Sequence, residues 1–331
     1  MILARAEAAK NIKNAAGNKS NWMKTKKIFY KDQVLVVNQR GGGIAEYYLS
    51  SGSKRTDIIF GYSDEDKYAG SMGDVLSPFP GRVENGEYTF YGEKNRIIGL
   101  SDPGKNPCHP FVKYLDWDLE LIDENHLRAR LQFKNGSSHD YGYPYSLSYK
   151  IDYELNNFGL IIKTLVKNIG EKVAPFGLGF HPYFSFSGQI DEIKLKIPAK
   201  KMVDFDHDLK PTGKFTEIKD SNLDFSRNKK IGSKKIDNCF FDLDFDQDQV
   251  AKTKLTSSDG IKEITIWQDS NFPYLQVYTG DNMKISQYLR RAVAIEPMSC
   301  CGYAANVPDM GLIELQPMGE FFGSWGVNCN F

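Results

Sequence analysis

Short stretches of alternating apolar and polar residues dominate the chain from Lys27 onward. In residues 145–155 every second side chain is apolar and the residues between them are polar. Because successive side chains of a β-strand point to opposite faces, this pattern predicts a strand with one buried and one wet face. Residues 127–133 and 193–197 repeat the pattern, and the turn signal Asn156-Asn157 leads into the run of residues 160–166. The sequence therefore predicts an all-β fold, a large antiparallel β-sandwich.

The same pattern continues to the end of the chain without a linker, a shift in composition or an internal repeat. We therefore expect a single domain over residues 27–331. Residues 1–26 carry several lysines and an arginine against the single acid Glu7, which predicts a basic, flexible tail. Residues 204–235 are rich in Asp, Lys, Pro and Gly, which predicts a long loop of the kind that carries binding groups.

The charge balance argues against two classes of partner. The 42 Lys and Arg residues equal the 42 Asp and Glu residues, so no overall field favours nucleic acid or an anionic membrane. No apolar run has the length of a membrane-spanning helix. The charge balance therefore favours an uncharged small molecule as the partner. The aromatic content of 13% is compatible with carbohydrate contacts and equally with a β core.

The five cysteines are odd in number and scattered, and the adjacent pair Cys300 and Cys301 cannot easily form a disulfide with each other. This distribution predicts reduced thiols and a cytoplasmic location. Cys108 precedes His109, but no second Cys or His cluster has zinc-like spacing, so we expect no metal site.

The stretch Gly-Phe-His-Pro-Tyr-Phe at residues 179–184 is the strongest candidate for chemistry. Pro182 pushes the preceding residue toward extended geometry, which places His181 at the end of a strand with a fixed direction. A titratable imidazole held among aromatic rings is suited to giving a proton to a sugar oxygen. The alternative is an ordinary core histidine.

Four further segments place polar groups beside turns. Arg82 follows Ser-Pro-Phe-Pro-Gly and precedes Asn85-Gly86, a hairpin signal. His109 lies in Pro-Cys-His-Pro, Asp237 stands at the entrance of a predicted strand, and Glu320 follows a glycine turn near the end of the chain. Taken singly, each has an ordinary structural explanation, such as a surface ion pair or a turn cap.

Together and in this order, these segments resemble the aldose 1-epimerase (galactose mutarotase) family. The resemblance covers nearly the whole chain after the tail, and its other matching segments are Tyr143-Pro144, Pro211-Thr212-Gly213, Leu223-Asp224-Phe225, residues 275–280 and Glu296-Pro297. It implies an antiparallel supersandwich whose concave face holds a monosaccharide. It also implies an isomerase that interconverts the α and β anomers of a free hexose such as galactose without a cofactor.

Carried over residue by residue, the resemblance implies that His181 is the general acid and Glu320 the general base. It also implies that His109 binds a sugar oxygen near the acid, and that Arg82 and Asp237 grip sugar hydroxyls. Opening a hemiacetal ring needs one proton delivered to the ring oxygen and one removed from the anomeric hydroxyl, so one acid and one base suffice. For this proton transfer near neutral pH, we expect a site that keeps the imidazole protonated and partly desolvates the carboxylate.

The chain departs from the family pattern in two places. It has His109-Pro110 where the family usually has His-Gly, and Pro317-Met318-Gly319-Glu320 where the family has Pro-Gly-Glu. One extra residue in a turn can move a side chain to the other face of a strand. Glu314 and Glu296 are therefore the alternative carboxylates.

Three rival functions stay open at this point. The first is a noncatalytic carbohydrate-binding or sensor protein on the same fold. The second is a glycoside-cleaving enzyme or a sugar lyase on a similar sandwich, although hydrolysis generally needs two carboxylates at a set distance. The third is a hexose-phosphate mutarotase, in which Arg82 and the lysine-rich loop would attract phosphate. A monomer and a homodimer are both compatible with the sequence.

Overall fold

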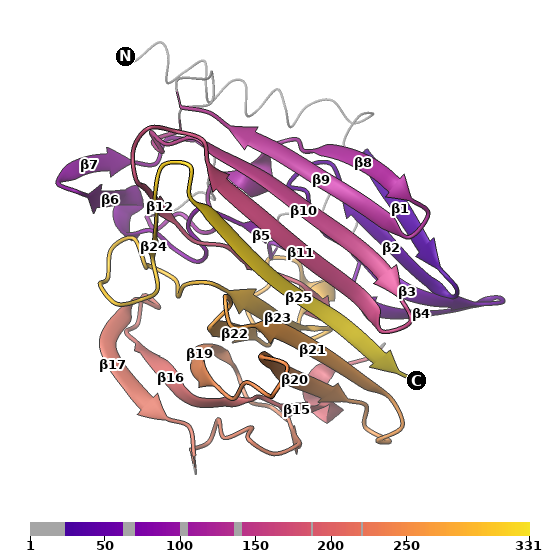
Figure 1. The fold of residues 1–331 in the computed structure, drawn as a ribbon. Helices are drawn as coiled ribbons and strands as arrows, with labels where there is room; N and C mark the ends of the chain where they lie inside the picture. The colour runs from indigo at the N-terminus through magenta and orange to yellow at the C-terminus, as the bar shows by residue number, and fades with distance from the viewer. Residues whose placement is uncertain (1–23, 62–69, 100–104, 136–140, 187, 220) are drawn as a thin grey trace.

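Two large antiparallel sheets make up most of the computed structural model, which describes residues 24–61, 70–99, 105–135, 141–186, 188–219 and 221–331 (Figure 1). The predicted all-β fold is confirmed. In the described part of the chain the first sheet has 12 strands. Its main path is β1 (Thr25–Tyr30), β2 (Gln33–Asn38), β3 (Ile44–Ser51), β4 (Lys54–Ile59), β14 (Tyr183–Phe184), β23 (Val293–Met298), β22 (Tyr274–Tyr278), β19 (Asp237–Leu243), β16 (Ala199–Phe205) and β17 (Pro211–Glu217), with β13 (Gly179–Phe180) and β5 (Val75–Leu76) beside it.

The second sheet has nine strands among the described residues. Their order is β18 (Lys229–Lys230), β15 (Lys194–Lys196), β20 (Val250–Thr256), β21 (Glu263–Asp269), β25 (Glu320–Asn330), β11 (Gly159–Asn168), β10 (Leu147–Asn156), β9 (His126–Phe133) and β8 (Asp118–Asp123). Two small ribbons pair β12 (Ala174–Phe176) with β24 (Ile313–Leu315) and β6 (Glu87–Phe90) with β7 (Glu93–Arg96). Short 3₁₀ turns lie at η2 (Glu84–Gly86), η3 (Val112–Tyr114), η4 (Ile190–Glu192) and η5 (Ser286–Tyr288).

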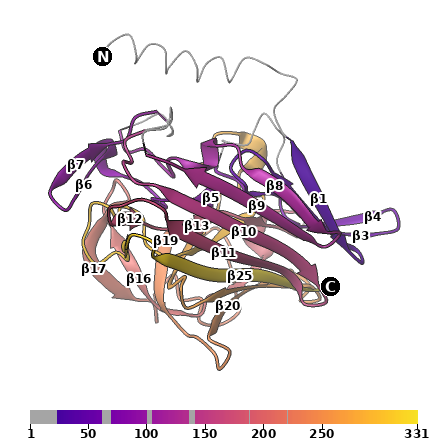
Figure 2. The ribbon, with the colours of Figure 1, turned by 45° about the horizontal axis from the view of Figure 1, so that its top comes forward.

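The alternating pattern of residues 145–155 became β10, whose apolar side chains from Leu147 to Leu155 are buried. Its partner β11 joins it through a tight turn, because Asn156 pairs with Gly159. The two large sheets lie one over the other (Figure 2). Their buried apolar side chains form a common core. Phe180 of the first sheet lies with its ring centroid 5.2 Å from that of Trp325 in the second. Burial of such aromatic side chains is the main force that holds the two layers together.

Two local predictions differ from the structure. Residues 211–217 form the edge strand β17 and not a loop. Most of this strand is exposed, so its sequence lacks the alternation that marks a half-buried strand. Asn85-Gly86 belongs to the 3₁₀ turn before β6, and the hairpin between β6 and β7 turns instead at Tyr91-Gly92, both of which have positive φ angles.

The first strand begins at Thr25, two residues before the predicted start of the domain, and residues 1–23 of the predicted tail lie outside the described residues. All five cysteines are free thiols. Within the described ranges, no helix has the length and apolar character that crossing a bilayer would need.

Candidate active site

A cavity of about 610 Å³ lies over one face of β19, β22 and β23 in the first sheet. In the strand register, Asp237 pairs with Tyr278 and Gln276 pairs with Glu296. Directly paired side chains point to the same face, and side chains two residues apart on a strand do so too. Asp237, Tyr278, Gln276 and Glu296 therefore share one face, and all four line the cavity. The volume is within the range of small-molecule sites.

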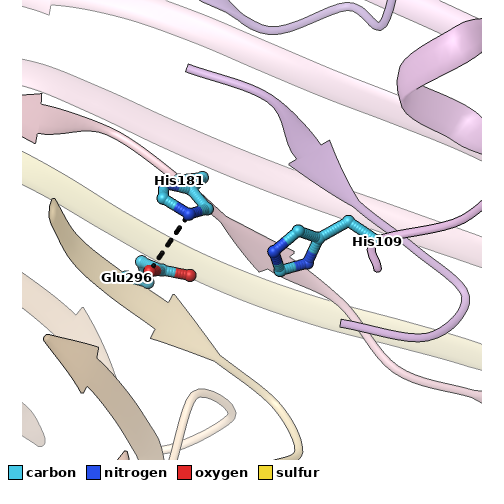
Figure 3. A group of neighbouring side chains, drawn as sticks. All are labelled: His109, His181 and Glu296. Atoms are coloured by element: carbon cyan, nitrogen blue, oxygen red, sulfur yellow. Dashed lines mark ion pairs between the residues drawn. The ribbon is translucent and has the colours of Figure 1, made fainter. Parts of the chain in front are cut away.

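His181 is brought to this cavity by the end of β13, as the sequence predicted, since β13 ends at Phe180 and Pro182 follows. Its imidazole stacks on Tyr183, with ring centroids 5.0 Å apart and an interplanar angle of 22°. The Nε2 atom of His181 lies 3.3 Å from Oε1 of Glu296 (Figure 3). Both side chains are buried, with residue exposures of 6% and 2%. An imidazole and a carboxyl group thus face each other at the floor of the cavity.

Burial acts on these two groups in opposite directions. It lowers the pKa of His181 to about 3, with a further contribution from the Lys113 cation. Burial, together with the nearby Asp237, holds the pKa of Glu296 well above its usual value. The sequence analysis expects a protonated imidazole, but burial favours the neutral form of His181, because removing water disfavours an isolated charge. Both shifts favour a neutral imidazole facing a protonated carboxyl group, an arrangement with one proton between the two side chains.

His109 comes from a different segment and points toward the same place (Figure 3). Its ring centroid is 5.4 Å from that of His181, with the two rings nearly perpendicular. Gly81 fixes it by two hydrogen bonds, since the His109 N–H donates to the Gly81 carbonyl at 2.7 Å and the Gly81 N–H donates to Nδ1 at 2.9 Å. Nδ1 is thereby the acceptor nitrogen, so Nε2 carries the proton and is a donor for a ligand oxygen.

The ligand-type atoms of His109, His181 and Glu296 all lie within 4.8 Å of one another. Two imidazoles and a carboxylate can hold a divalent metal. In a neutral imidazole only one nitrogen has a free lone pair, however, and in His109 the Gly81 N–H already occupies it. Metal binding by His109 would require breaking that hydrogen bond, so the donor set suits a polyhydroxylated ligand better than a metal.

Asp237 and Arg82 also line the cavity. An Asp237 oxygen accepts a hydrogen bond from the Gln276 amide at 2.7 Å. Burial raises the pKa of Asp237, and the Gln276 hydrogen bond and the positive charge of Arg82 act in the other direction. The cavity wall therefore offers a guanidinium donor, an amide and a carboxyl group, which are the groups that recognise hydroxyls.

Glu320 is the one predicted site residue that the structure does not bring to the cavity. It begins β25 in the second sheet, where it pairs in register with Lys167 of β11. Its Oε1 lies 3.1 Å from the Lys167 Nζ, and its side chain is 36% exposed. Glu314 is also exposed and accepts a hydrogen bond from the Tyr91 hydroxyl. The carboxyl group beside His181 is that of Glu296, one of the two alternative carboxylates.

A signal for Glu296 is present in the sequence. Residues 293–298 read Val-Ala-Ile-Glu-Pro-Met, and all six residues are buried in β23. An acid inside an apolar strand is costly to bury without a functional or structural reason. Four neutral polar residues for which the sequence predicts no role also line the cavity: Asn106, Gln276, Tyr278 and Tyr303. Such neutral polar residues are common on wet strand faces and carry little signal.

Comparison with known proteins agrees with this fold. The family model of aldose 1-epimerase matches residues 31–326, so the chain belongs to the aldose 1-epimerase family. An uncharacterized protein of Escherichia coli K12, YihR, is 27% identical over 290 residues, which cover 86% of this chain and 88% of that protein.

Solved structures give the same picture of the fold. An aldose epimerase homologue from C. elegans superposes with a TM-score of 0.81 at 18% identity, covering 93% of this chain and 98% of the other. A galactose 1-epimerase from Lactobacillus acidophilus superposes with a TM-score of 0.73 at 18% identity, covering 93% and 98%. At this identity the likeness establishes the galactose mutarotase-like fold.

Proposed function

We propose that the protein is an aldose 1-epimerase that interconverts the α and β anomers of a free hexose, with His181 and Glu296 as its acid and base. The observation that carries the proposal is the 3.3 Å contact between the His181 Nε2 and a Glu296 oxygen inside a cavity lined with hydroxyl-binding groups. A single shared proton is what the reaction requires, because one proton must be given and one taken in each ring opening.

The proposed sequence of steps begins when a sugar enters and its hydroxyls stabilise charge in the cavity. The shared proton then moves from Glu296 to His181, which forms an imidazolium and a carboxylate. Glu296 removes the proton of the anomeric hydroxyl, the C1–O5 bond breaks as C1 becomes an aldehyde carbon, and His181 protonates O5. Rotation about C1–C2 followed by the reverse transfers closes the ring on the other face, so no net proton or electron is consumed.

The remaining cavity residues orient the sugar in this proposal. His109 donates through Nε2–H to a sugar oxygen, since its Nδ1 is engaged with Gly81. Arg82 and the Asp237–Gln276 pair bind hydroxyls away from the reacting centre. No resident cofactor has a part in these steps.

Polarimetry of freshly dissolved α-galactose and α-glucose tests the proposal. The purified protein should accelerate the drift to the equilibrium rotation, and the His181→Gln variant should lose this acceleration while keeping its folded circular dichroism spectrum. Tight sugar binding without acceleration would support the noncatalytic sugar-binding alternative instead. Because Arg82, Lys105 and Lys284 line the cavity, hexose 6-phosphates belong in the same assay, and acceleration confined to them would identify a hexose-phosphate mutarotase.

A further inference from the structure

Lys113 is a fully buried lysine behind the two cavity histidines. It lies in the 3₁₀ turn η3, four positions after His109, and is 1% exposed. Its ammonium group donates a hydrogen bond to the Ser71 hydroxyl at 2.9 Å and lies 5.0 Å from the centre of the Tyr114 ring. Lysine is almost never buried without a reason, because desolvating its charge is costly. Lys113 does not line the cavity, so it has no direct part in the chemistry proposed above.

Ser71 begins a short turn that holds the backbone of His181 on both sides. The Gly73 N–H donates to the His181 carbonyl at 2.9 Å, and the His181 N–H donates to the Asp74 carbonyl at 3.0 Å. The turn closes through a hydrogen bond from the Asp74 N–H to the Ser71 carbonyl at 3.1 Å. Ser71 itself has a φ of 53°, an uncommon value for a serine that surrounding contacts must maintain.

We propose that Lys113 is a positioning residue for His181: it anchors the 71–74 turn through Ser71 and places a fixed positive charge behind the imidazoles of His181 and His109. This inference rests on the function proposed above. The path from the ammonium group to His181 runs through one side-chain hydrogen bond and two backbone hydrogen bonds, and the residues that make them are buried.

The electrostatic part of the role has a definite sign. The Lys113 charge lowers the pKa of both histidines, second only to burial in each case. Other titratable groups around His181 are Glu296 from β23, His109 from the segment before η3 and Tyr183 from β14. The buried Asp74 lies in the 71–74 turn and acts electrostatically on Tyr183. A nearby cation makes the imidazolium formed during the reaction a stronger acid, which favours delivery of its proton to the ring oxygen.

Three variants separate charge from shape. Lys113→Met removes the charge at similar length and Lys113→Arg keeps the charge. Ser71→Ala removes the hydroxyl that accepts from Lys113, at a residue that also lines the cavity. We expect Lys113→Met to lower kcat for anomer exchange by about 10-fold to 100-fold with KM changed less than about 3-fold, because a misplaced acid affects the transition state more than binding. Lys163→Met is the control, since this exposed lysine pairs with Glu154 in the second sheet.

Imidazole NMR titration gives a readout that does not depend on activity. In Lys113→Met, His181 should take up its proton at a higher pH than in the wild type, and in Lys113→Arg it should titrate near the wild-type pH. An unchanged His181 titration together with wild-type kcat in Lys113→Met would overturn the proposal. If the wild type shows no anomer exchange, the proposed function fails, yet the titration still tests the link between Lys113 and His181.

If Lys113→Met does not fold, the kcat of Ser71→Ala is measured in its place. A wild-type kcat in Ser71→Ala would refute the anchoring role.

Discussion

At the residue scale, burial shifts the pKa values of two facing groups, His181 and Glu296, in opposite directions. The imidazole of His181 is pushed toward its neutral form and the carboxyl group of Glu296 toward its protonated form. Because the two groups are within proton-transfer reach, a ligand that stabilises charge can move the proton between them. Neither residue would have this property on an exposed strand.

Replacing each candidate carboxyl group by its amide distinguishes Glu296 from Glu320. We expect Glu296→Gln to lower kcat for anomer exchange by about two to four orders of magnitude, the usual contribution of a general acid or base. We expect Glu320→Gln to retain activity within about 2-fold, because a surface ion pair with Lys167 contributes little. Steady-state polarimetry on both purified variants makes the comparison, and loss of activity in Glu320→Gln alone would reverse the assignment.

The buried imidazole also makes stability depend on pH with a predictable sign. An unfolded histidine takes up a proton near pH 6.5, whereas His181 in the folded protein remains neutral down to about 3. Acid therefore stabilises the unfolded state, and His181 reduces the free energy of unfolding by about 1.4 kcal/mol per pH unit as pH falls from 6.5 toward 3. Glu296 acts oppositely, since its raised pKa gives stability that is lost as pH rises above its unfolded value.

Urea unfolding at several pH values between 7 and 5 isolates the histidine contribution. The free energy of unfolding of the wild type minus that of His181→Gln should fall by about 1 to 2 kcal/mol over this range. His207→Gln is the matched control, because that side chain is 89% exposed. A difference for His181→Gln that stays flat with pH would contradict the burial effect.

At the scale of elements, antiparallel register places Asp237, Gln276 and Glu296 on one face of the first sheet. β22 pairs with both β19 and β23, and this pairing aligns Asp237, Gln276 and Glu296 beside one another. Turns then add the remaining groups, since Gly81 holds His109 and the 71–74 turn holds His181. A shift of one residue in any of these strands would point its side chains away from the cavity.

Two glycines with similar backbone angles test the importance of the 71–74 turn. Gly73 and Gly92 have φ angles of 73° and 79°, but a Cβ at Gly73 would meet the Ile44 carbonyl oxygen at 1.8 Å, and one at Gly92 would meet nothing within 4 Å. Gly92→Ala should cost about 1–2 kcal/mol from the left-handed conformation alone. Gly73→Ala should cost clearly more and should reduce anomer exchange, because the turn holds His181.

Thermal and urea unfolding of both alanine variants provide the comparison, and polarimetry at a temperature where both are folded provides the activity. Equal loss of unfolding free energy in the two variants would contradict this prediction. It would show that the backbone around Gly73 and Ile44 can move to make room for a Cβ at little cost in stability.

At the scale of the whole molecule, two features stand out: a core shared by both sheets and a balanced surface charge. The chain has a formal net charge of 0 at pH 7. A net charge near zero gives little electrostatic repulsion between copies of the protein. A neutral sugar needs no electrostatic steering to reach the cavity.

This balance predicts a minimum of solubility near pH 7, where the net charge passes through zero. Solubility should rise toward pH 5 as carboxylates and histidines take up protons, and toward pH 9 as residual positive charge is lost. Precipitation midpoints in polyethylene glycol at constant ionic strength measure the effect. Midpoints that do not change between pH 5 and pH 9 would show that apolar contacts control association.

Local pattern was enough to predict the β fold and several strands, because side-chain alternation along β10 depends only on neighbouring residues and on which face meets the core. The position of His181 after a strand was equally readable, since Pro182 restricts the residue before it. The chain alone could not show that Glu296 and not Glu320 faces His181. These carboxyl groups differ in the sheet to which their strands belong, and that is set by pairing between residues more than 100 positions apart. Pairing between distant strands buries Glu296 and places its carboxyl group beside the imidazole of His181.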